Sequence, residues 1–310
     1  MSTSARKPVR PKPAPPRLLV YLDAVVRAGS IRKAAEQLHI ASTALNRRIL
    51  NLEAELGTPL FERLPGGVRL TAGGEIYMGY VHRSLADLES ATSQIEQLRG
   101  LMRGEVRIAA AESAGVSLLP RLVAAFQARH PGVRFRIRLG GTESLMPVLL
   151  EDAADLLLAH DPPQSEALER LAEIRQPLCA ILRANHPLAA RQSLRLADCA
   201  PYPVALGEES FGGRKLIEQA LLKSRFKLDV ALVASSVETM KAYTRETGAI
   251  SFQFALGAAG PERGLVCVPL SDRALANSRL VLAARRGRSL PIAAQSFAES
   301  LRQALREYAG

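Results

Sequence analysis

The spacing of hydrophobic residues becomes helical shortly after the N-terminus. Large apolar side chains recur there at three- and four-residue steps, as on one face of an α-helix: Leu18, Leu19, Leu22, Val25 and Val26. Gly29 is expected to end this helix, and Ser30 is a suitable N-cap for a second helix, IRKAAEQL. The small side chains of Ala34 and Ala35 would allow the second helix to pack closely against its neighbours.

A third helix, ALNRRILNLEAEL, is predicted between the short turn HIAST and Gly57. Its apolar stripe repeats at i, i+4, i+7 and i+11: Leu45, Ile49, Leu52 and Leu56. In the following TPLFERLPGGVRLT, two extended runs flank Pro65-Gly66-Gly67, which predicts a hairpin. Three compact helices followed by a hairpin are typical of a winged helix-turn-helix, here over residues 17–71.

A long helix is predicted from Thr71, which can cap it, to about Arg99. Its apolar positions again follow three- and four-residue steps: Tyr77, Tyr80, Val81, Leu85, Leu88, Ile95 and Leu98. Such a stripe packs either on its own domain or on a second copy of the chain, and we favour self-association. The segment Gly100–Gly104 has the composition of a hinge, so residues 72–104 are interpreted as a linker helix and hinge.

Beyond the hinge, short β-rich runs alternate with helical segments to the end of the chain. Runs such as VRIAAA, VRFRIRL, PVALG and LDVALVA predict an α/β architecture with parallel sheet. We expect one domain over residues 105–310, built of two lobes. The expected boundaries are residues 105–162 and 269–310 for lobe one, residues 163–268 for lobe two, and crossings near 161–165 and 266–271.

The net charge of +11 is concentrated near the N-terminus. Residues 1–71 hold 12 Lys or Arg against 5 Asp or Glu, whereas the rest of the chain is close to neutral. A basic N-terminal unit on a nearly neutral body is the charge distribution expected of nucleic-acid binding. Residues 1–16 carry five prolines and four basic side chains, which predicts a disordered basic tail. It serves either as a passive leader or as an arm that adds non-specific DNA affinity.

Other function classes are disfavoured by what the sequence lacks. No stretch approaches the ~18 consecutive apolar residues of a membrane span, and no apolar run follows the basic start, so we expect a cytoplasmic protein. The histidines show no metal-ligand spacing, and no GxSxG, Walker loop or dinucleotide fingerprint is present. An enzyme, a metal and a cofactor are therefore not expected. Cys179, Cys199 and Cys267 are far apart in sequence and are interpreted as core thiols.

Residues 18–104 resemble the LysR-type transcriptional regulators. The matching segments are GSIRKAAEQLHI, ALNRRI, LEAELGTPLFER, VRLTAGG and LRGLMRGEVRIA, in the order and spacing of the family. Later segments, including SLLPRLVAAFQARHPGV and SVETMKAYTRETGAISF, resemble the family more loosely. The resemblance implies a winged helix-turn-helix, a dimerising linker helix and a periplasmic-binding-protein-like α/β effector domain. The partners expected from this assignment are double-stranded DNA with an interrupted palindromic operator, a small-molecule effector, further copies of the chain in a homodimer or homotetramer, and RNA polymerase.

The chain departs from the family pattern at the start of the third helix. The family commonly has Ser-Gln-Pro where this chain has Ala41-Ser42-Thr43, so that Ser42 or Thr43 would have to cap the helix one step later. Asn46 replaces a common serine, and Leu50 and Asn51 stand where basic residues are frequent. We therefore expect a related mode of DNA binding with a different operator sequence.

The third helix is the candidate recognition helix, because its apolar stripe turns inward and leaves polar side chains at its front. Ser42, Thr43, Asn46 and Arg47 are predicted to face base edges in the major groove, where Arg pairs with guanine and Asn with adenine. Other basic side chains are candidates for phosphate contacts: Arg32, Lys33, Arg48, Arg63 and Arg69.

Loops that follow strands and precede helices are the candidate effector site. Ligands of two-lobed α/β domains bind where helix N-termini offer unpaired N–H groups. The candidates are Ser113, Ala114, Gly115, Thr142, Glu143 and Ser144 in lobe one, and Glu208, Phe211 and Gln253 in lobe two. Four acidic residues near these loops favour an effector with amine or hydroxyl donors: Glu112, Glu143, Glu208 and Glu209. A solute-binding transport protein and a purely architectural DNA binder are the alternatives.

Overall fold

The computed structural model describes residues 15–97, 102–222, 224–258 and 264–309. The chain divides into two units, residues 1–100 and 101–310, and each is described by itself. Most of the predicted tail and the first part of the predicted hinge lie outside the described residues. No helix among the described residues is long and apolar enough to cross a membrane.

The first unit begins with three helices, α1 (Arg17–Ala28), α2 (Ile31–Gln37) and α3 (Ser42–Leu56). As predicted, α1 ends at Gly29 and α3 at Gly57, both of which adopt a left-handed backbone (φ 61° and 65°). The side chain of Ser30 caps α2 by accepting a hydrogen bond from the backbone N–H of Lys33 at 3.5 Å. Ala34 and Ala35 are fully buried, which confirms the predicted close packing of α2.

The hairpin consists of β1 (Phe61–Leu64) and β2 (Gly67–Leu70), which pair in antiparallel register. Glu53 ties this wing to α3, because its Oε1 accepts hydrogen bonds from the backbone N–H groups of Leu60 (2.7 Å) and Phe61 (3.0 Å). The predicted stripe of α3 is buried at Leu45, Ile49 and Leu52, whereas Leu56 is exposed. Leu56 lies in the last turn of α3, beyond the helices that cover the rest of the stripe.

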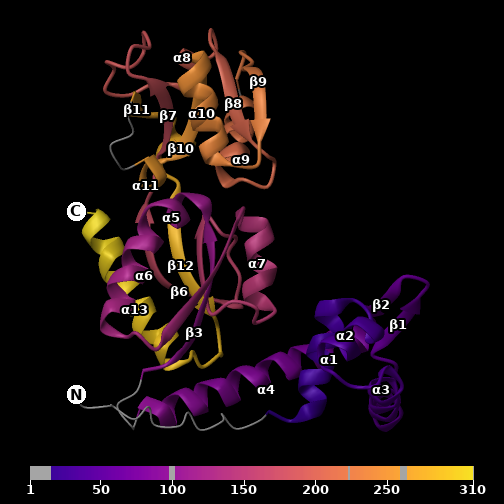
Figure 1. Cartoon of the computed structure of the whole chain (residues 1–310). Coiled ribbons are helices and arrows are strands. Elements are labelled where there is room, and N and C mark those ends of the chain that lie inside the picture. The colour runs from indigo at the N-terminus through magenta and orange to yellow at the C-terminus, as the bar shows by residue number, and fades with distance from the viewer. Residues whose placement is uncertain (1–14, 98–101, 223, 259–263, 310) are drawn as a thin grey trace, which may run out of the picture. The chain divides into compact units, whose positions relative to one another are not determined.

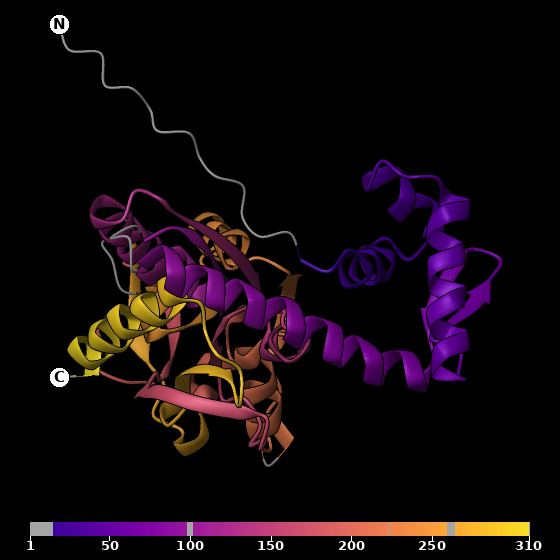
Figure 2. The ribbon, with the colours of Figure 1, turned by 90° about the horizontal axis from the view of Figure 1, so that it is seen from below.

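A long helix, α4 (Ala72–Gln97), follows the wing, and the hydroxyl of Thr71 caps it by accepting from Gly74 N–H at 3.0 Å (Figure 2). The apolar stripe of α4 is buried in its own unit at some positions and exposed at others. Val81 is fully buried in the core of α1–α3, whereas Tyr80 and Ile95 are about half exposed (49% and 53%). Leu98 lies outside the described residues.

The second unit contains two five-stranded sheets, one in each lobe (Figure 1). Sheet one has the strand order β4-β3-β5-β12-β6, and its members are β3 (Gly104–Ala111), β4 (Val133–Gly140), β5 (Leu156–His160), β6 (Leu168–Arg175) and β12 (Arg279–Arg285). β3 is parallel to β4 and β5, whereas β12 runs antiparallel to both of its neighbours. The predicted parallel pairing is present in three of the five strands, and the antiparallel β12 makes the sheet mixed.

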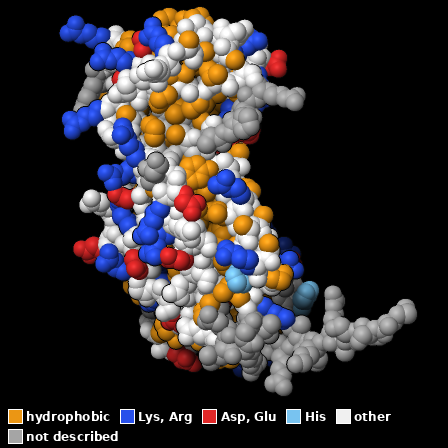
Figure 3. Space-filling view, turned by 90° about the vertical axis from the view of Figure 1, so that its left-hand side faces the viewer, with side chains coloured by type: hydrophobic (Ala, Val, Ile, Leu, Met, Phe, Trp, Pro, Cys, Tyr) orange, Lys and Arg blue, Asp and Glu red, His pale blue; other side chains and the backbone are white. Residues whose placement is uncertain are grey.

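Sheet two has the strand order β11-β7-β10-β8-β9, and its members are β7 (Leu178–Arg183), β8 (Pro203–Gly207), β9 (Asp229–Ala234), β10 (Ile250–Phe254) and β11 (Leu265–Pro269). It repeats the plan of sheet one, since β8 is parallel to its two neighbours and β7 is antiparallel to β10 and β11. Figure 3 shows one face of the two lobes, with hydrophobic side chains in the middle of the upper lobe and Lys and Arg side chains along one side.

The chain crosses between lobes at other positions than predicted. β6 pairs with β12 in sheet one, so the first crossing lies at Gln176–Pro177, not near 161–165. Leu275 is buried in the core of lobe two, so the return lies just before β12, not near 266–271. The sequence LERLAEIR of β6 has only a weak strand pattern, and its identity as a strand depends on pairing with a segment more than 100 residues away.

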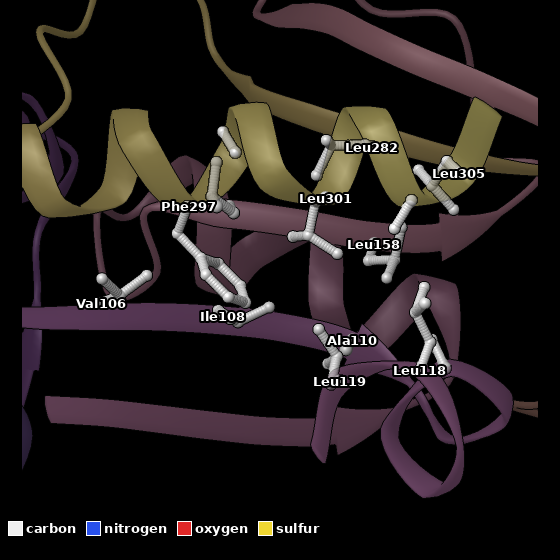
Figure 4. Close-up of a cluster of buried hydrophobic side chains, with 14 of the residues drawn as sticks. Val106, Ile108, Ala110, Leu118, Leu119, Leu158, Leu282, Phe297, Leu301 and Leu305 are labelled. Carbon is white, nitrogen blue, oxygen red and sulfur yellow. The ribbon is translucent and has the colours of Figure 1, made fainter. Parts of the chain in front are cut away.

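Alternate residues of the sheet-one strands face opposite layers of helices. Ile108 and Leu158 face α6 (Leu118–Arg129) and α13 (Ile292–Ala309), whereas Ala109 and Leu157 face α7 (Thr142–Leu150). In Figure 4, Phe297, Leu301 and Leu305 of α13 point into the core beside β3 and β5. Burial on both faces explains why these strands read as continuous apolar runs.

The remaining helices complete the second unit. α5 (Glu112–Val116) follows β3 directly, and α11 (Ala255–Ala258) follows β10. In lobe two, α9 (Gly212–Leu222) and the short helices α8 (Leu196–Cys199) and α12 (Arg273–Ala276) contribute side chains to one core, while α10 (Val237–Thr247) packs on the opposite face of sheet two.

Phe297 is expected to dominate the core of lobe one. Its ring packs edge-on against Phe126 (ring centres 5.3 Å apart) and Phe135 (4.7 Å). Phe297→Ala should lower the free energy of unfolding of the chain by about 3–5 kcal/mol, because it leaves a cavity as well as losing apolar burial. Urea unfolding measures this loss. Gln303→Ala, at an exposed position of the same helix, should stay within about 0.5 kcal/mol, and an equal loss in both variants would contradict the assignment.

Candidate functional site

The front of α3 presents the polar side chains predicted to read DNA. Ser42, Thr43 and Arg47 are exposed, and Asn46 is half-buried beside the wing. The N-cap of α3 is Ala41, and no side chain caps the helix, so the predicted capping by Ser42 or Thr43 is wrong. The helix begins one residue too early for either hydroxyl to occupy the cap position, and both remain at the exposed front of α3.

The wing is attached to α3 through two of the predicted residues. Arg63 on β1 donates from Nη2 to Oδ1 of Asn46 at 2.8 Å, which fixes the orientation of the Asn46 amide. Arg69 on β2 is bound to Glu62 across the hairpin, with Nη2 2.6 Å from Oε2. This pairing raises the pKa of Arg69. Nε and Nη2 of Arg69 donate to Glu62, so Nη1 is the nitrogen that stays available for a phosphate.

The other predicted basic residues differ in how they are held. Arg48 lies over the ring of Tyr21, 5.5 Å from its centre, and Arg32 lies 3.5 Å from Glu36 on the next turn of α2. Within the described part of the chain, the side chains of Lys33 and Arg47 have no ion-pair or hydrogen-bond partner. Arg47 is thus an exposed cation at the front of α3 whose donors are all available for a ligand.

The second candidate site is a narrow pocket between the lobes, with about 560 Å³ of empty space including its open mouth. It lies at the carboxyl ends of β3, β4 and β8, where the following helices begin, and at the carboxyl end of β5. Four of the predicted effector residues line it: Ser113, Thr142, Phe211 and Gln253. The structure thus brings together loops that are up to 140 residues apart in sequence.

Five predicted effector residues do not line the pocket: Ala114, Gly115, Glu143, Ser144 and Glu208. Ala114 is buried in the core of lobe one, and Gly115 packs against Leu139. Ser144 turns back to donate to the carbonyl oxygen of Gly141 at 2.9 Å. The exposed Glu143 forms an ion pair with Lys215 of lobe two, and Glu208 is exposed at the surface.

His160, at the end of β5, is the buried centre of the pocket wall. Its Nε2 lies 2.7 Å from the hydroxyl of Ser113, and its ring stacks on Phe254 of lobe two at 3.5 Å. Burial lowers the pKa of His160 to about 3, so the ring is neutral near pH 7. A neutral imidazole can accept or donate at Nδ1, which has no partner among the described residues.

Two further buried nitrogen atoms of the pocket lack partners within the described part of the chain. Gln253 accepts the backbone N–H of Phe254 at its Oε1 (2.9 Å), which leaves Nε2 as an unpaired donor. Arg214 donates from Nε to Glu218 at 2.5 Å, which leaves Nη1 unpaired. Unpaired buried donors are costly unless a ligand or water satisfies them.

Glu112 is the one predicted acidic neighbour that lines the pocket. Its Oε1 accepts the N–H of Val237 at 3.1 Å, at the N-terminus of α10 in the other lobe. Burial raises the pKa of Glu112, and the hydrogen bond from Val237 partly opposes this shift. The carboxylate therefore joins the lobes and occupies a helix N-terminus that an anionic ligand could otherwise use.

The lobes also touch backbone to backbone. Gly141 lies against the carbonyl oxygen of Ser210, so closely that a Cβ at position 141 would collide with it. Sequence reasoning missed this glycine, as well as His160 and Arg214. Their roles depend on which strand ends face each other across the cleft, and the sequence carries no signal for that arrangement.

The groups that line the pocket can bind a polar small molecule. No cluster of three or more potential metal ligands occurs among the residues that the structure describes. Helices α7 and α9 both direct their N-termini, at Thr142 and Gly212, toward the pocket. Helix N-termini and the unpaired donors of Arg214 and Gln253 together favour negative charge or oxygen acceptors.

Protonation of His160 should make the fold sensitive to mild acid. The unfolded chain binds this proton below about pH 6.5, whereas the folded chain resists it down to about pH 3, so stability falls as the pH falls through this window. Between pH 6.5 and 5, the His160→Gln variant should lose less free energy of unfolding than the wild type, by about 1.4 kcal/mol per pH unit. Urea unfolding at several pH values measures the two slopes. Equal slopes would show that His160 is protonated in the folded state.

Comparisons with known proteins agree with this arrangement. Residues 16–75 match the bacterial regulatory helix-turn-helix protein of the lysR family, and residues 99–306 match the LysR substrate binding domain. The RuBisCO operon transcriptional regulator of Allochromatium vinosum is 37% identical over 206 residues, which cover 66% of this chain and 67% of the relative.

Two solved structures share the fold over most of the chain. A full-length OxyR variant from Pseudomonas aeruginosa has a TM-score of 0.70 at 22% identity, over 92% of this chain and 93% of that one. Full-length CbnR in complex with its target DNA has a TM-score of 0.60 at 21% identity, over 93% and 99%. The two family matches together span nearly the whole chain, and the relatives are regulators and not enzymes. The chain therefore belongs to the LysR family of transcription regulators, with a helix-turn-helix DNA-binding domain and a substrate-binding effector domain.

Proposed function

We propose that this regulator binds an interrupted palindromic operator as a homodimer or homotetramer, and that a small acid bound between the lobes changes its DNA affinity. On this proposal it works in the cytoplasm, where the DNA is, and controls transcription through RNA polymerase. The single observation that carries the proposal is the coexistence of an unpaired, exposed Arg47 on α3 with unpaired, buried donors in the pocket of the second unit.

The DNA-binding half of the proposal rests on how the polar residues of α3 are held. Asn46 is oriented by Arg63, and Arg47 has no competing partner in the described part of the chain. An oriented amide can bond adenine in two places, and a free guanidinium can bond guanine in two places. The exposed Leu50 lies one turn beyond Arg47 on the same face and offers an apolar contact to a thymine methyl group.

Self-association is supported by exposed apolar surface in both units. Besides Tyr80 and Ile95 on α4, the edge strand β4 exposes Ile137 and Leu139. The edge strand β9 of the other sheet exposes Val230 and Val233. Apolar edge strands of this kind pair with other chains when left uncovered. A homo-oligomer would bury these surfaces and would place two α3 helices on the two half-sites of an operator.

An acidic effector fits the pocket better than the amine donor expected from the sequence. Of the four acidic residues on which that expectation was based, Glu143, Glu208 and Glu209 do not line the pocket, and the Glu112 carboxylate already accepts a hydrogen bond. The unpaired atoms of Arg214 and Gln253 are donors. A carboxylate would satisfy them, and its charge would be favourable at the N-termini of α7 and α9.

An effector can change the DNA affinity only if it binds two conformations of the protein with different affinities. The pocket is lined by both lobes, which are joined by the crossing at Gln176–Pro177 and the return before β12. A ligand that contacts both lobes binds the closed arrangement more tightly than an open one. The difference in those affinities is the free energy available for changing DNA binding.

Footprinting of the purified protein on its own genomic DNA, at constant near-physiological salt, tests the DNA-binding part. We expect discrete sites with two protected half-sites about one helical turn (~34 Å) or more apart. Diffuse binding that disappears with added salt would contradict sequence-specific recognition.

Arg47→Ala should then reduce the ratio of operator affinity to scrambled-DNA affinity by roughly 5- to 150-fold, because one bidentate base contact discriminates by ~1–3 kcal/mol. Lys33→Ala is the matched control. As a phosphate contact it should weaken both DNAs equally and reduce the salt dependence of binding. An unchanged ratio for Arg47→Ala would exclude it as a base-reading residue.

A thermal-shift panel of small carboxylates and their amides tests the effector class. The carboxylates should stabilise the protein more than the matching amides, and Arg214→Gln should weaken their binding about tenfold or more, because a charged hydrogen bond is lost. Arg225→Gln, an exposed cation nearby in sequence that does not line the pocket, should leave carboxylate binding unchanged. Equal stabilisation by amides and acids would contradict an acidic effector.

A further inference from the structure

Two of the cysteines that are distant in sequence are neighbours in the second unit. Cys179 lies on β7 and Cys267 on β11, and these strands pair antiparallel with Cys267 opposite Ile181 and Pro269 opposite Cys179. Residues two apart on a strand face the same side of the sheet, so the two thiols are diagonal neighbours on one face. The sequence, which predicted three separate core thiols, gave no sign of this pair.

The two thiols are close enough to affect each other's pKa, and the Cys179 thiol also donates to the carbonyl oxygen of Pro177 at 3.7 Å. Interaction with the Cys179 thiol lowers the pKa of Cys267, as does the nearby ammonium group of Lys241, while burial opposes them. The pKa of Cys179 is raised by the same interaction and by its burial. The proton of the pair therefore stays on Cys179, and Cys267 is the sulfur that becomes a thiolate.

The exposure of the three cysteines assigns them different reactivities. Cys267 is an exposed residue on the edge strand β11, whereas Cys179 is buried on β7. Cys199 on α8 is also buried, and burial raises its pKa to about 12, so it is inert. The thiolate is the reactive form of cysteine, so an attacking thiol and a resolving thiol stand side by side.

We propose that Cys179 and Cys267 are a redox-active pair that hydrogen peroxide converts into an intramolecular disulfide. The Cys267 thiolate attacks a peroxide oxygen; the S–O bond forms, the O–O bond breaks, and the leaving hydroxide takes up a proton to become water. The Cys179 sulfur then attacks the Cys267 sulfenic acid. The S–S bond forms as the S–O bond breaks, and the departing hydroxide takes the Cys179 proton as a second water. The two thiols lose two electrons in total, and the peroxide gains them.

The fold allows the closing movement that the bond requires. The sulfur atoms have to approach to about 2.05 Å. β11 is an edge strand of sheet two, held on one side only by β7, so it can shift without disturbing the central strands. The disulfide would then join β7 and β11 covalently, next to the segment that leads from lobe two back to lobe one.

The disulfide would lie beside the pocket between the lobes. Gln253 is the residue of β10 directly opposite Cys179 on β7, so it shares a sheet face with the pair. Its Nε2 is one of the unpaired donors of the pocket. Because β7 and β10 are adjacent strands, oxidation of Cys179 would alter the position of Gln253 in the pocket.

The test uses the full-length protein, treated with hydrogen peroxide after reduction and removal of the reductant. Free thiols are then alkylated, and the protein is digested and analysed by mass spectrometry. We expect loss of two thiols, a peptide pair linked through Cys179 and Cys267, and a free Cys199. Cys267 should react at least ~10-fold faster than Cys199, since the thiolate fraction falls tenfold for each unit of pKa.

Variants separate the two steps. Cys179→Ser should stop the reaction at a Cys267 sulfenic acid that dimedone traps, and Cys267→Ser should leave Cys179 unreactive. Cys199→Ser is the matched control and should form the disulfide as the wild type does. Three free thiols after peroxide treatment, a disulfide between two chains, or a dimedone adduct on the wild type without a linked peptide would each overturn the proposal. These outcomes do not depend on DNA or effector binding, because both of those are measured separately on the reduced protein.

Discussion

The two sheets of the second unit are buried on both faces, and this constraint determines where a ligand can bind. Helices cover each face, as α6 and α13 do on one side of sheet one and α7 on the other. Space for a ligand remains beyond the strand ends, where the chain turns from strand to helix. Ser113 after β3, Thr142 after β4 and Phe211 after β8 stand at such turns, and His160 is the last residue of β5.

The same constraint explains the unusual state of His160. It is the last residue of a strand that is buried along its whole length, so its imidazole has to be neutral and needs an uncharged partner. Ser113 supplies one hydrogen bond and Phe254 supplies a flat apolar surface from the other lobe. A buried histidine at this place thus links the stability of lobe one to the position of lobe two.

Local sequence patterns predicted most of the first unit, although not the cap of α3. Gly29, Gly57 and Ser30 act within one or two turns of their own helices, and the stripe of α3 depends on neighbours fewer than forty residues away. The effector domain was predicted as a two-lobed α/β fold, but its details depend on distant pairings. β6 is a strand because β12 lies beside it, and the lobe boundaries shift with it. Ala114 and Ser113 are adjacent in sequence, yet one faces the core and the other the pocket, a difference set by a five-residue helix that could not be foreseen.

Gly141 has a consequence for how this regulator can change over time. Because its Cα lies against the Ser210 carbonyl of the opposite lobe, any larger residue would act as a wedge that holds the lobes apart. Such a protein could still fold, since each lobe has its own core. If effectors act by closing the lobes, as proposed, such a protein would stay open whatever metabolites surround it. On that proposal, position 141 is a place where a single codon change separates a responsive regulator from one with a fixed output.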